Sequence, residues 1–88
     1  MTKTFRFVGY STLNGETRVR YANSKSRKNV LSRNGHVNIE IFDAGEALHP
    51  MDLVDLLLNR VEQGVIVGSA ETRAVRAEAE RLGFIINS

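Results

Sequence analysis

The sequence has no cysteine and no tryptophan, and its aromatic residues are limited to four Phe and two Tyr. The absence of cysteine excludes a disulfide, a thiolate nucleophile, and zinc or iron–sulfur sites that depend on cysteine ligands. With so few aromatic rings, the core must be built mainly from aliphatic side chains. The fold must therefore be stabilised by the packing of these side chains, within one chain or between copies of it.

Long apolar runs are also missing. The longest apolar stretches, around 56–58 and 65–67, are too short to span a bilayer, and the first residues lack the apolar segment of a secretion signal. With 88 residues, 42% hydrophobic and 25% charged, the chain has the size and composition of one small globular domain. We expect a single soluble domain over residues 1–88, located in the cytoplasm, with no membrane partner.

Acidic residues are nearly absent from the first 35 positions. Eight basic residues there face one acid, Glu16, for a charge of +7. Residues 36–88 hold four arginines and nine acids, for a charge of −5, and the two parts together carry the net +2. Such a field attracts a charged partner beyond contact distance. It also suits attraction between the two halves of one molecule, so the charge narrows the class of partner but indicates no activity.

Two stretches of alternating residues flank the turn sequence Asn14-Gly15. Phe5–Ser11 and Thr17–Tyr21 each have the two-residue period of a half-buried strand. Asn-Gly favours a type I′ turn, because both central residues of this turn need positive φ. We therefore predict a β-hairpin. The alternation separates Phe5 and Phe7 from Arg6, Val8 and Tyr10 in the first strand, and Val19 and Tyr21 from Arg18 and Arg20 in the second.

The middle of the chain predicts a short helix and a third strand. Asn23 or Ser24 can cap a helix over about residues 25–33, and Asn34-Gly35 is typical of a helix end. Residues 37–41 alternate again, which predicts a strand with three inward side chains, Val37, Ile39 and Ile41. We interpret residues 44–50 as a connection.

The last part of the chain predicts two helices. Apolar residues recur at helical spacing from Met51 to about Gln63, after a proline suited to the first helical position. A second helix is predicted from a Ser69 cap to Leu82. Val65–Val67 and Phe84–Ile86 are either parallel strands of a βαβ unit, or a linker and a tail beside a helical hairpin, which their short length favours.

These elements predict an α+β domain with a three-stranded, mainly antiparallel sheet, built from hairpin, helix and strand and packed by two C-terminal helices. The arginines of the hairpin are assigned to the face of Tyr10, where cations could attract phosphates and the ring could stack on a base. The commoner alternative is a solvated face, or one whose arginines pair internally, for example with Glu40. The candidate binding residues of this basic surface are Arg6, Tyr10, Arg18, Arg20, Lys25, Arg27, Lys28 and Arg33.

The helix at 51–63 is apolar over more than one stripe. A small domain has a limited core in which to bury that much aliphatic surface, so the helix is a candidate interface for a homodimer or another partner. The candidate interface residues are Leu53, Leu56 and Leu57. Burial of the same helix beneath the sheet is the alternative.

No pattern indicates catalysis, a metal or a cofactor. Gly68-Ser69 precedes a helix, as an anion-binding turn does, but it lacks the full glycine pattern and a following lysine, so an ordinary serine cap is favoured. His36 and His49 have no further ligand at a metal-binding spacing. Asp52 and Asp55 fit the solvated face of an amphipathic helix. We expect no catalytic residue, no metal site and no cofactor.

Three segments resemble known sequences: Phe5–Gly15, Arg18–Asn23 and Asn34–His36. They resemble small uncharacterised proteins of tailed marine bacteriophages, over roughly the first 40 residues. That family has no assigned activity and no assigned site residues. The resemblance implies a phage accessory protein that acts inside an infected bacterium.

The function expected from the sequence is that of a non-enzymatic binding or regulatory module. It would dock on an acidic macromolecular partner through the basic hairpin and first helix. The alternative is a nucleic-acid-binding protein that uses the same cations on phosphates and Tyr10 for stacking.

Overall fold

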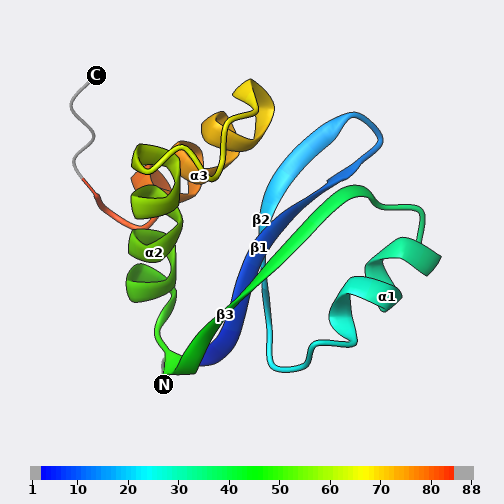
Figure 1. Ribbon diagram of the computed structural model, residues 1–88, viewed down its shortest axis with the longest axis horizontal. Helices are drawn as coiled ribbons and strands as arrows, with labels where there is room; N and C mark the ends of the chain where they lie inside the picture. The colour runs from blue at the N-terminus through cyan, green and yellow to red at the C-terminus, as the bar shows by residue number, and fades with distance from the viewer. Residues whose placement is uncertain (1–2, 85–88) are drawn as a thin grey trace.

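The computed structural model describes residues 3–84, which form three strands and three helices in the order β1, β2, α1, β3, α2, α3. The strands make an antiparallel sheet in the order β2-β1-β3, with β1 in the centre. Figure 1 shows α2 and α3 on one side of this sheet and α1 on the other. The predicted α+β fold is therefore confirmed.

β1 (Phe5–Leu13) and β2 (Glu16–Ala22) form the predicted hairpin. Asn14 and Gly15 have φ values of 54° and 79°, the positive values that a type I′ turn requires. The two strands pair along their whole overlap without a register shift. The turn therefore determines which residues of β1 and β2 lie opposite each other.

Residues directly opposite each other in an antiparallel pair have side chains on the same face. Tyr10 lies opposite Val19, and Val8 lies opposite Tyr21. These side chains face α2 and α3, because Val8 and Tyr10 belong to the core that the two helices complete. Arg18 lies opposite Ser11 and therefore faces the side of α1, as does Arg20.

α2 (Pro50–Glu62) and α3 (Ser69–Arg81) cover the first of these faces. The core consists of aliphatic side chains around one tyrosine: Val8, Tyr10, Leu53, Leu57, Ile66 and Val75. Leu53 and Leu57 are 0% exposed, so their predicted place in an interface is wrong. The three-stranded sheet is wide enough to bury the main apolar stripe of α2. Leu56 is half-buried and packs against the same core.

The segment between α2 and α3 is irregular and contains no strand. The predicted linker at Val65–Val67 is therefore confirmed, and the alternative of a parallel strand there is wrong. Its central residue, Ile66, is 2% exposed and fills the core, while Val65 and Val67 are exposed. The cap of α3 is Gly68, whose backbone is extended, and not Ser69, which is the first helical residue. Of Phe84–Ile86, Phe84 is irregular and the other two lie outside the described residues.

β3 (Val37–Leu48) continues through most of the segment 44–50 that we interpreted as a connection. Asp43 Oδ1 accepts the backbone N–H of Gly45 at 2.7 Å, and Gly45 has a φ of 84°. This local turn lets the strand bulge and still pair with β1 beyond it. The prediction of an inward Val37 is also wrong, since Val37 is 61% exposed. The positive φ of Asn38 and a nearby register shift interrupt the alternation there.

α1 (Arg27–Arg33) contacts β3 and lies on the opposite side of the sheet from α2 and α3 (Figure 1). Leu31 is 2% exposed and holds this short helix in place. The helix ends as predicted: Gly35 has a φ of 89°, and the N–H of His36 donates to the carbonyl of Leu31 at 3.0 Å. Among residues 3–84, no helix is long and apolar enough to cross a membrane.

Replacement of a core leucine tests the burial of α2. Leu57→Ala should lower the free energy of unfolding by about 2–5 kcal/mol, because it leaves a cavity where the side chain is 0% exposed. The control is Met51→Ala at a residue that is 49% exposed, for which we expect about 0.5 kcal/mol or less. Urea denaturation at several protein concentrations measures both. A loss for Leu57→Ala that disappears on dilution would instead place Leu57 between two chains.

Candidate binding surface

Most cations of the N-terminal part gather on β2, on the loop after it and on α1. Arg18 and Arg20 come from β2 and point to the side of α1. The loop and the helix contribute the others, and all four of these are exposed. We call this set the basic surface: Arg18, Arg20, Lys25, Arg27, Lys28 and Arg33.

Few carboxylates neutralise the basic surface. Within residues 3–84, the ion pairs are Arg6–Asp43, Arg18–Glu16 and Arg81–Glu78. Of these, only the exposed Arg18–Glu16 pair, at 2.8 Å, involves the basic surface. The acids of α2 and α3 therefore do not engage its other five cations in the described part of the chain. Ion pairing between the two halves of the molecule, which the charge pattern also allowed, is limited to Arg6 and Asp43 within residues 3–84.

Arg6 is separate from the basic surface, because it forms an ion pair with Asp43. Its Nε and Nη2 donate to the two oxygens of Asp43 at 3.0 and 3.2 Å. The Arg6 guanidinium lowers the pKa of Asp43, and the N–H of Gly45 lowers it further. The pair therefore stabilises the bulge of β3, and Arg6 is less available to a partner than the sequence predicted.

Tyr10 does not belong to the basic surface. It is 8% exposed and lies in the core under α2 and α3, so its predicted role in stacking is wrong. Burial raises the pKa of its hydroxyl, and Glu40 and Glu71 raise it further. Glu40 lies opposite Tyr10 and is therefore on the sheet face that α2 and α3 cover, whereas Arg18 and Arg20 are on the face of α1. The predicted pairing of Glu40 with a hairpin arginine is therefore also wrong.

A hydrogen-bonded chain joins three polar residues beneath the basic surface. Arg20 Nε donates to Ser11 Oγ at 2.9 Å, and Ser11 Oγ is hydrogen-bonded to His36 Nδ1 at 2.8 Å. The pKa of His36 is lowered by burial and by the charges of Arg20 and Arg27. Ser11 is 0% exposed, so its hydroxyl is closed to a substrate. The chain positions Arg20 and is not a nucleophile relay.

No local sequence pattern predicts this chain of hydrogen bonds, because its members are far apart in the sequence. Ser11 and His36 are separated by 25 positions, and neither has a local motif. The pairing of β1 with β3, which sets Thr12 opposite Val37, and the end of α1 bring them together. His49 is exposed and caps α2, away from this cluster. Among the residues that the structure describes, no group of three or more His, Asp or Glu could hold a metal ion.

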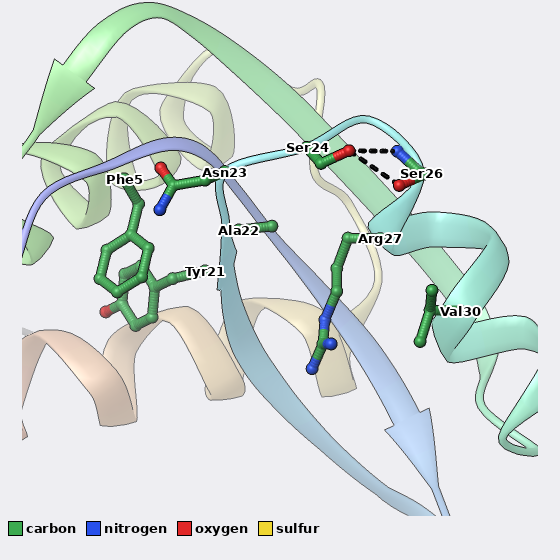
Figure 2. A pocket seen from close by; sticks show the side chains of 8 residues that line it. All are labelled: Phe5, Tyr21, Ala22, Asn23, Ser24, Ser26, Arg27 and Val30. Carbon is green, nitrogen blue, oxygen red and sulfur yellow. Dashed lines mark hydrogen bonds between the residues drawn. The ribbon is translucent and has the colours of Figure 1, made fainter.

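An open hollow of about 440 Å³ lies where β2 leads into α1. Figure 2 shows the paired rings of Phe5 and Tyr21 on one side of it and the Arg27 side chain on the other. Ser24 Oγ accepts the N–H of Ser26 at 3.2 Å and shapes the turn into α1. Because Tyr21 faces the core helices and Arg27 belongs to α1, the hollow wraps around the end of β2.

The geometry of the basic surface suits the binding of anions. Five guanidinium or ammonium groups without a carboxylate partner in the described residues are arranged over one strand, a loop and a helix. No aromatic side chain is among the large hydrophobic residues that residues 3–84 leave exposed, and the rings of Phe5 and Tyr21 in the hollow beside Arg27 are half-buried and paired with each other. The surface can therefore recognise charge, and the described residues give it no fully exposed ring of the kind on which single-strand binders stack bases.

Comparisons of the chain with protein-family models, with curated proteins and with solved structures find no match. The resemblance of the N-terminal part to small phage proteins therefore stays a prediction.

The lowered pKa of His36 predicts a loss of stability in mild acid. Between pH 7.5 and 5.5 the unfolded chain binds a proton at the ordinary pKa of 6.5, whereas folded His36 binds it only at lower pH. The unfolded state then holds more protons, so the free energy of unfolding decreases as the pH falls through this window. The pKa of Asp43 is also lowered, from an ordinary value of 3.8, so its effect on the free energy of unfolding changes only at more acidic pH, outside the window of His36.

Thermal denaturation of His36→Gln and His49→Gln tests this assignment. The fall in melting temperature between pH 7.5 and 5.5 should be smaller in His36→Gln than in the unchanged protein. His49→Gln should keep the full fall, because the bond between Ser11 and His36 is intact. Equal falls in the two variants would contradict the role of His36.

Proposed function

We propose that this protein is a non-enzymatic binding module that docks on an acidic macromolecular surface through its basic surface. The observation that carries the proposal is the absence of a carboxylate partner, within residues 3–84, for Arg20, Lys25, Arg27, Lys28 and Arg33. A concentrated positive charge of this kind accelerates encounter with an acidic partner and orients it.

The proposal favours an acidic protein over a single-stranded nucleic acid as the partner. The single-strand alternative required Tyr10 as a stacking ring, and Tyr10 is buried. What remains is charge recognition by several flexible side chains around a hollow with mixed apolar and polar walls. An acidic protein surface offers carboxylates for the cations and apolar side chains for such a hollow.

The resemblance to phage proteins supports a cellular location and a general role for the protein. We place the protein in the cytoplasm of an infected bacterium, as a soluble accessory protein that acts by binding and needs no cofactor. The self-association suggested by α2 has less support, because two of the three leucines that suggested it are fully buried.

Matched charge reversals test the proposal. Arg27→Glu with Lys28→Glu changes the basic surface, and Arg73→Glu with Arg76→Glu changes the net charge equally at exposed positions of α3. The probe is polyglutamate, followed by fluorescence anisotropy at two salt concentrations. The first variant should weaken binding by about tenfold, or about 1.4 kcal/mol, and the second by much less. Both should keep their thermal stability within about 1 kcal/mol.

The result separates three possibilities. Equal losses in the two variants would mean that net charge alone attracts the polymer, and would overturn the docking surface. Duplex DNA of the same charge serves as the second probe. If DNA binds more tightly than polyglutamate, with an affinity that falls linearly in log salt, the partner is a nucleic acid.

A further inference from the structure

The sheet has two edge strands, β2 and β3, and they differ in regularity. β3 pairs with β1 through two register shifts and contains positive φ values at Asn38 and Gly45. Bulges of this kind protect an edge from pairing with another strand. β2 has seven residues in continuous register and no residue with positive φ. Only the edge of β2 has the regular geometry that a further strand needs.

The two-residue turn determines which backbone N–H and C=O groups of β2 point away from β1. Leu13 and Glu16 flank the two-residue turn, so they form a hydrogen-bonded pair. Hydrogen-bonded and non-bonded pairs then alternate along an antiparallel ladder. The N–H and C=O groups of Thr17, Val19 and Tyr21 therefore point away from β1. No other backbone or side-chain group within residues 3–84 bonds to them.

A hollow of about 380 Å³ lies along this edge, between β2 and α3. Its α3 wall carries two small side chains, Ala74 and Ala77, which leave space beside the strand. The wall is fixed to β2, since the Tyr21 hydroxyl donates to Glu78 at 2.5 Å and Glu78 also accepts from Arg81. The separate hollow of Figure 2 lies beside the same strand farther along, at Tyr21 and Ala22. The edge of β2 is thus flanked by preformed space.

The charge on β2 restricts what can occupy this edge. Arg18 and Arg20 project on the side of α1 at alternate positions. A strand added beside them would bring every second side chain next to these guanidinium groups, and the other side chains next to Ala74 and Ala77. A second copy of β2 paired antiparallel about Val19 would place Arg18 opposite the Arg20 of that copy, and like charges directly opposite each other repel.

We infer that the edge of β2 binds an extended acidic segment of a partner protein as a fourth strand of the sheet, with carboxylates at alternate positions and small side chains between them. This inference rests on the proposed function and specifies how the acidic partner is held. Backbone hydrogen bonds to Thr17, Val19 and Tyr21 supply affinity. Arg20, which has no carboxylate partner within residues 3–84, and Arg18, which would exchange the exposed Glu16 for a carboxylate of the partner, supply the preference for acidic residues.

Backbone amide hydrogen exchange of the full chain tests strand addition. The probe is an acetylated heptapeptide of alternating glutamate and threonine. At saturating peptide, exchange at Thr17, Val19 and Tyr21 should slow by about tenfold or more, because their N–H groups become hydrogen-bonded. The amides of Arg18 and Arg20 already bond to β1 and should change little.

The same measurement distinguishes the inference from the proposed function. If amides of α1 respond to the peptide while exchange at Thr17, Val19 and Tyr21 is unchanged, strand addition is overturned and the basic surface still stands. If neither α1 nor β2 responds at millimolar peptide, the proposed function fails, and the inference fails with it.

Two variants test the two parts of the recognition separately. Thr17→Pro removes one outward N–H and should weaken peptide binding by about tenfold relative to Thr17→Val, which keeps it. Both lose the hydroxyl pair with Thr12, so that loss cancels in the comparison. Arg18→Glu with Arg20→Glu should lose the glutamate peptide and bind an alternating lysine and threonine peptide, with the same three amides protected. Equal affinities of the two Thr17 variants would overturn the strand geometry.

Discussion

The two-residue turn at Asn14-Gly15 is the constraint on which the rest of the molecule depends. Because both residues have positive φ, Leu13 and Glu16 are held opposite each other, and every later pair of the hairpin follows from them. This register puts Tyr10 and Val19 under the core helices. It directs Arg18 and Arg20 to the other face. A slip of one residue in β2 would exchange these two sets and bring cations into the core.

The separation of charge in space follows from that register and from the position of α1. The core helices carry most of the carboxylates, while the basic surface lies across the sheet from them (Figure 1). Asp43 is the one acid of the C-terminal part that forms an ion pair with an N-terminal cation in the described residues, and its partner is Arg6. The charges that the sequence places far apart therefore stay apart in the fold.

Local signals predicted most elements, and long-range pairing caused the errors. The hairpin, the end of α1 and the helix after Pro50 all followed from turn residues and periodicity. β3 was predicted too short, because residues 44–50, which include Gly45, resemble a connection, although Asp43 accepts the N–H of Gly45 within a bulge. Tyr10 lies on the opposite face from the predicted one, because alternation within each strand does not show which faces of the two strands match across the turn. The two-residue length of the turn fixes Leu13 opposite Glu16, and this pairing gives the register that shows which faces match.

The sequence by itself determined the uneven charge, the hairpin and the amphipathic helices, since these depend on residues close together in the chain. The tertiary structure decided which faces are covered. Leu53 and Leu57 are buried because the sheet is wide enough to receive α2, and Ser11 meets His36 only through strand pairing and the end of α1. Burial and contact depend on segments distant in sequence, and no local pattern records how those segments pack.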